Sequence, residues 1–117
     1  MRLDPALLNS RCWIRGTANL QLEEGLADCE RSLALSETSA TLDSRALIRL
    51  RQGRLDEAIA DATAALERAP RQAASLYVRG VARLRKGERE AGELDLAAAR
   101  RLSFDIESRY RAYGIVP

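Results

Sequence analysis

Histidine is absent from this sequence of 117 residues, and its absence excludes several kinds of catalytic site. The Ser-His-Asp and Cys-His arrangements of nucleophilic enzymes need a histidine as general base, and histidine is also the commonest zinc ligand. No glycine-rich phosphate loop and no group of residues with metal-ligand spacing takes its place. We therefore expect that the protein is not an enzyme and that it needs no cofactor and no metal.

Long apolar runs are also missing. No stretch approaches the ~18 apolar residues that a membrane span needs, and residues 1–5 lead into a helical pattern without the apolar core of a signal peptide. We therefore expect a cytoplasmic protein with no membrane partner. A periplasmic or secreted location stays open if a signal segment preceded this sequence and was removed.

Lysine occurs once, at Lys86, whereas arginine and alanine are abundant, a bias typical of GC-rich bacterial genomes. The formal net charge is only +2, and acidic and basic residues are interleaved along the chain. This balance argues against a nucleic-acid partner, because no basic block or tail is present. The length favours a single domain over residues 1–117.

The sequence repeats itself with a period of 34 residues. A leucine, two arginines and a small residue recur at this spacing: Leu8, Leu42 and Leu76; Arg11, Arg45 and Arg79; Arg15, Arg49 and Arg83; Cys12, Ala46 and Gly80. Asp61 and Asp95 keep the period, but Asp28 precedes Asp61 by 33 residues. We attribute the slip to one extra residue near 19–21.

Apolar residues at helical spacing and glycines at segment ends, Gly53 and Gly87, predict paired helices. No segment has the alternation of a half-buried strand, so the fold class is all-α. The expected helices cover about 5–19, 22–35, 39–52, 55–68, 73–86, 89–102 and 105–112.

Two segments resemble the tetratricopeptide repeat (TPR) family. Residues 51–70 resemble the second half of such a repeat, and residues 75–87 resemble the first half through Arg79 and Gly80. The family's signature positions in the first segment are Gly53, Leu55, Ala58, Ala62, Ala65 and Pro70. The resemblance covers about residues 6–102 and implies a right-handed superhelical α-α solenoid. Its three hairpins would cover about 5–37, 39–72 and 73–103, followed by a short capping helix at about 104–113.

The recurring charges suggest structural ion pairs. Arg11, Arg45 and Arg79 are expected to pair with Asp28, Asp61 and Asp95, because a guanidinium group fits a carboxylate with two hydrogen bonds. The arginines one turn later, Arg15, Arg49 and Arg83, could form a basic ladder for RNA or an acidic peptide. We favour the alternative that their stems cover the core while their charged groups reach solvent.

Cys12 and Cys29 occupy positions that face each other across a hairpin of the TPR kind. Buried free thiols are one alternative, and a disulfide in an oxidising compartment is the other. For the capping helix, we expect Phe104, Ile106, Tyr110 and Tyr113 to fold onto the last hairpin.

In the TPR family the first helices line a concave groove that takes a peptide. The corresponding exposed positions here are Asn9, Trp13 and Thr17; Asp43, Leu47 and Arg51; Tyr77, Val81 and Arg85. Arg51 and Arg85 suggest an acidic or mixed ligand with an apolar anchor near Leu47 and Val81. Trp13 could instead be a core residue or cover the N-terminal edge.

The resemblance therefore favours a protein–protein interaction scaffold that binds a peptide or protein segment in this groove. Two alternatives stay open. One is an RNA-binding helical repeat, suggested by the arginine ladder. The other is a self-assembling module of a larger protein, with a homodimer through an exposed repeat edge.

Overall fold

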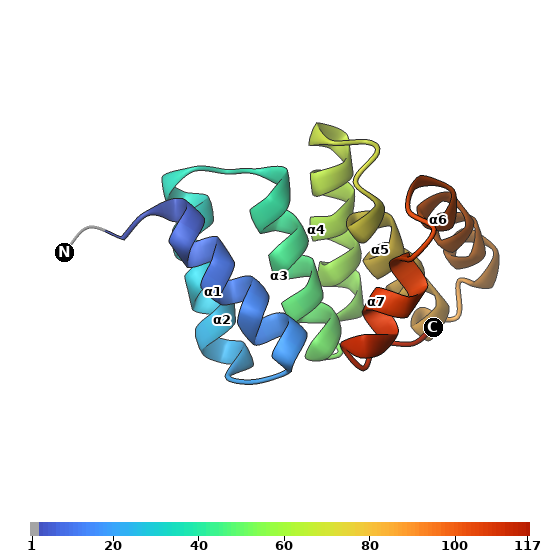
Figure 1. Ribbon diagram of the computed structural model, residues 1–117, viewed down its shortest axis with the longest axis horizontal. Coiled ribbons are helices and arrows are strands. Elements are labelled where there is room, and N and C mark those ends of the chain that lie inside the picture. Colours follow the sequence, from blue (N-terminus) through green and yellow to red (C-terminus); the bar gives the residue numbers. More distant parts are fainter. Residues whose placement is uncertain (1–2) are drawn as a thin grey trace.

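The computed structural model describes residues 3–117, and the regular elements in that range are all α-helices (Figure 1). They are α1 (Pro5–Ala18), α2 (Leu22–Leu35), α3 (Ser39–Arg51), α4 (Leu55–Arg68), α5 (Ala73–Lys86), α6 (Arg89–Leu102) and α7 (Ile106–Ala112). Each expected helix is present, with boundaries within one residue of those predicted. The all-α fold class is confirmed.

Left-handed backbone conformations end the first helix of each pair. Gly53 has φ +75° and Gly87 has φ +93°, a region that glycine enters without steric cost. The turn after α1 instead uses two residues with side chains, Asn19 at φ 57° and Gln21 at φ 50°. The residue that shifts the repeat by one therefore lies in a turn and leaves both helices intact.

Consecutive helices pack as hairpins, α1 with α2, α3 with α4 and α5 with α6, along a molecule of 46 × 26 × 25 Å (Figure 1). The first helices are neighbours in one layer, because α3 contacts both α1 and α5. We call the side of this layer that carries Asn9, Trp13, Asp43, Leu47, Arg51, Tyr77, Val81 and Arg85 the first-helix face.

Small residues allow the two helices of a hairpin to cross closely. A Cβ atom on Gly80 would lie 3.0 Å from the carbonyl oxygen of Gly92, and one on Gly92 would lie 2.9 Å from that of Gly80. A side chain at either position would therefore require the facing backbone to shift. The positions equivalent to Gly80 hold Ala46 and Cys12, which are fully buried.

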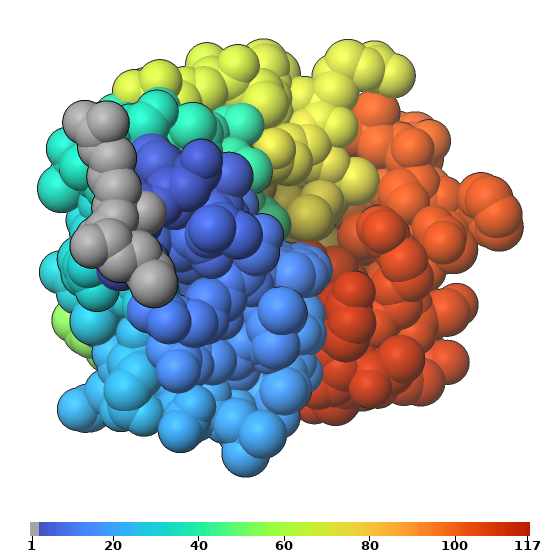
Figure 2. All heavy atoms as spheres, turned by 60° about the vertical axis from the view of Figure 1, so that its left-hand side comes forward, coloured from blue at the N-terminus to red at the C-terminus, as the bar shows by residue number. Residues whose placement is uncertain are grey.

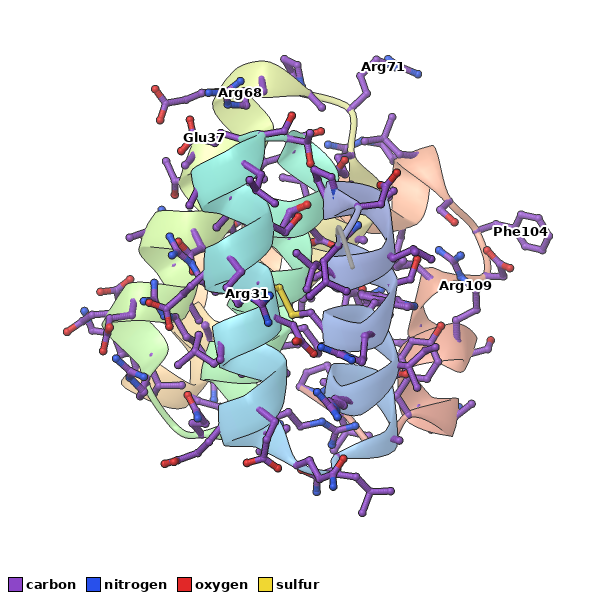
Figure 3. All side chains as sticks on the ribbon, turned by 90° about the vertical axis from the view of Figure 1, so that its left-hand side faces the viewer. Arg31, Glu37, Arg68, Arg71, Phe104 and Arg109 are labelled. Atoms are coloured by element: carbon purple, nitrogen blue, oxygen red, sulfur yellow. A yellow bond between two sulfur atoms is a disulfide. The ribbon has the colours of Figure 1, made fainter. Side chains whose placement is uncertain are left out.

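The last helix, α7, contacts both helices of the last hairpin, α5 and α6, as the sequence suggested, but Phe104 takes no part in this packing. Phe104 is 96% exposed and points into solvent, so the expectation that it folds onto the last hairpin is wrong (Figure 3). Ile106 and Tyr110 are buried as expected, but they join the core beneath the first-helix face. The segment 106–116 thus lies across the first helices and extends towards α1 (Figures 1 and 2).

Candidate functional site

The first-helix face is largely covered by the chain's own C-terminal segment, residues 106–116. Aromatic rings connect the two. The ring of Tyr110 lies 4.9 Å from that of Tyr77 on α5 and 5.2 Å from that of Tyr113, measured between centroids. Tyr113 in turn meets Trp13 of α1 edge to face at 6.0 Å. Such pairs add to the stabilisation that burial of the rings provides.

Arginines of the face hold the same segment through its backbone. The Nη2 group of Arg51 donates a hydrogen bond to the carbonyl oxygen of Tyr113, and that of Arg85 donates to the carbonyl of Val116 at 3.2 Å. Arg51 also donates to the carbonyls of Gly16 and Thr17 at the end of α1, each at 3.0 Å. Burial, and then the charge of Arg85, lowers the pKa of Arg51.

These contacts correct part of the predicted groove. Leu47, Tyr77 and Val81 are completely buried, so the expectation of exposed side chains at these positions, with an apolar anchor for a partner, is wrong. The preference for an acidic ligand loses its basis as well, because Arg51 and Arg85 bind carbonyl oxygens of this chain. Local periodicity could not predict this, since the cover comes from a distant part of the sequence.

One part of the face remains open. A hollow of about 320 Å³ lies at the end of the layer nearest the starts of α3 and α5. Its lining combines three predicted groove residues with five that sequence reasoning missed: Asn9, Trp13 and Asp43, then Ser10, Ala40, Ser44, Gln72 and Ala74. Asn9 accepts a hydrogen bond from the Ser44 hydroxyl at 2.6 Å, so α1 and α3 are joined at its floor.

Asp43 is the charged residue of this hollow. Its side chain is buried, and its Oδ1 atom accepts a hydrogen bond from the Ser75 hydroxyl at 2.8 Å. Within residues 3–117 it forms no salt bridge and its Oδ2 atom has no hydrogen-bond donor. Burial raises the pKa of Asp43 to about 6, against the opposing effect of the Ser75 hydrogen bond.

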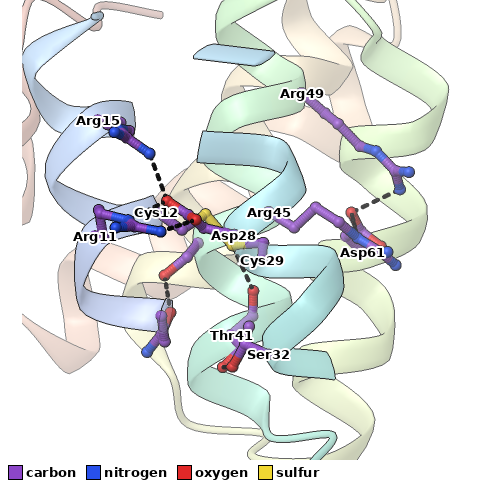
Figure 4. The surroundings of a disulfide bond; sticks show 12 residues. Arg11, Cys12, Arg15, Asp28, Cys29, Ser32, Thr41, Arg45, Arg49 and Asp61 are labelled. Atoms are coloured by element: carbon purple, nitrogen blue, oxygen red, sulfur yellow. Dashed lines mark hydrogen bonds and ion pairs between the residues drawn. A yellow bond between two sulfur atoms is a disulfide. The ribbon is translucent and has the colours of Figure 1, made fainter. Parts of the chain in front are cut away.

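The other three buried aspartates are each held by a pair of arginines. Arg11, Arg45 and Arg79 bind Asp28, Asp61 and Asp95 with two hydrogen bonds each, at N–O distances of 2.7–2.9 Å. The predicted partners are therefore brought together in every hairpin. Figure 4 shows the surroundings of Asp28 and Asp61. Hydrogen bonding to Arg11, together with the charges of Arg11 and Arg15, lowers the pKa of Asp28 despite its burial.

The second row of arginines completes these sites. Arg15, Arg49 and Arg83 each donate one hydrogen bond to the same three aspartates, at 2.6–2.8 Å. The expectation that these guanidinium groups reach solvent is therefore wrong, because a buried carboxylate lies within their reach. The arginines of the basic ladder that suggested RNA binding are thus bound to Asp28, Asp61 and Asp95 of this chain.

Cys12 and Cys29 are joined by a disulfide, one of the two alternatives that the sequence left open (Figures 3 and 4). Both residues are completely buried and pack against Ile48 of α3. The bond links α1 to α2 at the position where Gly80 lies against α6 in the third hairpin. In the first hairpin a covalent link thus takes the place of the close backbone contact that joins the helices of the third hairpin.

We expect reduction of this disulfide to lower the free energy of unfolding by about 3 kcal/mol, because a bridge over a separation of 17 residues constrains the unfolded chain. Urea unfolding with and without a phosphine reductant measures the difference. The Cys12→Ala/Cys29→Ala variant is the control and should not respond to the reductant. Alkylation of both thiols in protein that is unfolded without any reductant would contradict the bridge.

A second expected result concerns pH. Because the folded-state pKa of Asp43 is higher than its unfolded-state value, the ionised carboxylate destabilises the fold. The free energy of unfolding of Asp43→Asn relative to wild type should rise from pH 4 to about 6 and then level off, gaining about 3 kcal/mol. The groups facing Asp43, Ser75 of α5 and Tyr110 of α7, stay uncharged in this range. If the difference in free energy of unfolding between the two proteins did not depend on pH, Asp43 would not be a buried carboxylate without a counter-charge.

No helix in residues 3–117 combines the length and the apolar character that crossing a membrane requires. In the same range, no three or more Cys, Asp or Glu side chains gather where they could hold a metal ion. Comparison of the chain with family models, curated proteins and solved structures finds no match.

Proposed function

We propose that the chain is an α-solenoid module of the TPR kind whose first-helix face binds a segment of another polypeptide. The repeat of 34 residues, the three successive hairpins and the single layer of first helices support this assignment. Stacked hairpins of this kind create an extended surface that a partner can follow.

One observation carries the proposal: the face already holds a polypeptide. Residues 106–116 lie on it through aromatic rings and through hydrogen bonds from Arg51 and Arg85 to backbone carbonyls. Aromatic side chains beside arginine are the commonest components of polypeptide-binding hot spots. The open hollow beside Trp13 and Asn9 offers further surface of the same face to a partner.

A selection from a library of displayed random peptides tests this proposal. We expect the immobilised protein to enrich peptides that bind in the micromolar range, and Trp13→Ala to weaken their binding at least tenfold by calorimetry, since hot-spot aromatics contribute about 2 kcal/mol or more. Phe104→Ala is the matched control, because it removes an exposed aromatic ring that lies outside the hollow.

Failure to enrich any peptide would contradict polypeptide binding. Enriched peptides that bind wild type and Trp13→Ala equally would place the binding surface elsewhere on the molecule.

Self-association is a second candidate, favoured by one observation at the N-terminal edge. Leu7 and Ile14 of α1 are both more than half exposed, and with Leu3 and Leu8 they line an apolar hollow of about 350 Å³. An exposed apolar edge of this kind can bind a second copy of a repeat module. Sedimentation equilibrium would detect a dimer, and Leu7→Glu/Ile14→Glu should convert it to a monomer.

We also propose that the protein works in an oxidising compartment. Disulfides persist in oxidising environments and are rare in the cytosol, so the bridge between Cys12 and Cys29 favours the exported alternative over a cytoplasmic location. Trapping of thiols with an alkylating agent in intact cells distinguishes the two, because a cytoplasmic protein would be recovered with both thiols modified.

A further inference from the structure

Asp43 differs from the other buried aspartates of the repeat in having no counter-charge among residues 3–117. Asp28, Asp61 and Asp95 each accept hydrogen bonds from two arginines. Asp43 is buried to the same degree, 6% exposed against 6% for Asp95, and receives one hydrogen bond from Ser75. An ionised carboxylate removed from water without a cation is costly, and the architecture of this chain avoids that cost at every other aspartate it buries.

The surroundings of Asp43 are suited to a cation that comes from outside. Asp43 lines the open hollow, and no positively charged side chain is among the lining residues. The amide oxygens of Asn9 and Gln72 and the hydroxyl of Ser44 supply further hydrogen-bond acceptors there. The indole ring of Trp13 lines the same hollow, and aromatic rings attract guanidinium and ammonium groups.

We propose that the hollow binds a positively charged side chain, arginine or lysine, of the polypeptide that the first-helix face takes up. The proposal rests on the proposed function and specifies the chemistry of the partner. An incoming guanidinium or ammonium group would form an ion pair with Asp43, as the paired arginines do with Asp28, Asp61 and Asp95. The volume of the hollow, about 320 Å³, accommodates such a side chain.

The charged group of the partner's side chain should contribute more to binding than the aliphatic part of that side chain. The hollow is lined by one buried carboxylate, Asp43, so an uncharged side chain of the same shape would leave that charge unpaired. Protonation of Asp43 removes the attraction, and binding should therefore weaken as the pH falls below about 6. Ser75 and Tyr110, which face Asp43 from α5 and α7, are uncharged over this range and leave the carboxylate as the titrating group.

A titration followed by nuclear magnetic resonance tests the proposal on the full chain. The probe is Nα-acetyl-arginine N-methylamide, and its uncharged isostere Nα-acetyl-citrulline N-methylamide is the comparison. At pH 7.5 we expect the arginine compound to shift the indole N–H signal of Trp13 and the side-chain amide signals of Asn9 and Gln72. The citrulline compound should bind at least tenfold more weakly, and lowering the pH to 5 should weaken the arginine compound by a similar factor.

Asp43→Asn keeps the shape of the side chain and should abolish the preference for arginine over citrulline. This variant is expected to be more stable than wild type, so unfolding cannot account for lost binding. Asp56→Asn is the control, because Asp56 is an exposed aspartate on α4 outside the hollow. Equal binding of the two compounds to wild type, or an unchanged preference for arginine in Asp43→Asn, would overturn the proposal.

The two proposals fail in different ways. Enriched peptides that depend on Trp13 but carry no arginine or lysine in common would overturn the cation site and leave polypeptide binding in place. Selective binding of the arginine compound without enrichment of any peptide would support the cation site and count against the proposed function.

Discussion

Replacement of Asp61 by alanine is expected to lower the free energy of unfolding by about 3 kcal/mol, because it leaves two arginines without their buried partner. Arg45 and Arg49 both extend from α3 to this carboxylate on α4. The substitution therefore removes the ion pairs that link the two helices of the central hairpin. Urea unfolding followed by circular dichroism measures the difference. The loss should be smaller for Asp28→Ala, since its partner Arg11 is half exposed and can be hydrated.

The matched control lies on the same helix. Asp56 is an exposed aspartate at the start of α4 and pairs with Lys86 at the surface. Asp56→Ala should cost less than about 1 kcal/mol, the range of exposed ion pairs and of charges near a helix start. If Asp61→Ala were no more destabilising than Asp56→Ala, the paired arginines would not contribute to the stability of the fold.

Replacement of Tyr110 by alanine should lower the free energy of unfolding by about 3–5 kcal/mol, the range for removal of a buried aromatic side chain. Tyr110 is completely buried between Tyr77 and Tyr113 and fixes the C-terminal segment to the first-helix face. Its loss should also raise the denaturant sensitivity of fluorescence from Trp13, because Tyr113 contacts that indole ring. Chemical unfolding and tryptophan emission check the two effects.

Two controls separate burial from other causes. Tyr110→Phe removes a buried hydroxyl that has no hydrogen-bond partner in residues 3–117, so the stability should change by less than about 1 kcal/mol. Phe104→Ala removes an exposed ring two residues before α7 and should have almost no effect. A large loss in Phe104→Ala, or none in Tyr110→Ala, would mean that the C-terminal segment is held in a different way.

Much of the fold could be predicted from the sequence because its determinants are local or repeated. Gly53 and Gly87 mark the ends of their helices, since the left-handed conformation that glycine adopts there stops a helix. The pairing of Arg45 with Asp61 follows from helical spacing across one short turn, and the repeat places the same pair in each hairpin. A fixed period thus carries information about contacts as well as about elements.

The candidate site was predicted less well because it depends on contacts between distant segments. The position of α7 is decided by the packing of Tyr110 on Tyr77 and of Tyr113 on Trp13, and no periodicity connects these residues. The aromatic spacing of Tyr110 and Tyr113, followed by Ile115, was the available signal for a segment with one buried side. It indicates burial and agrees with packing on the last hairpin, but it does not indicate that Tyr113 reaches Trp13 of α1.

Asp43 illustrates the same limit at a single residue. Its position in the first helix predicts a groove residue, but the structure buries it, with Ser75 of α5 donating a hydrogen bond to it and its charge acting on Tyr110 of α7. A charged residue that departs from the repeat, where the equivalent positions hold Asn9 and Tyr77, was the signal in the sequence. Only the three-dimensional structure could show that no side chain of residues 3–117 supplies a cation to it.

Photo-crosslinking in cells of the source organism tests most directly whether the open end of the first-helix face binds a polypeptide. A benzophenone amino acid in place of Ala40, which lines the hollow and leaves Trp13 and Asp43 intact, would capture whatever lies there. We predict covalent adducts with another polypeptide at position 40, none when the same group replaces the exposed Phe104, and fewer at position 40 when Asp43→Asn is added. No adduct at position 40, or equal adducts at positions 40 and 104, would contradict it.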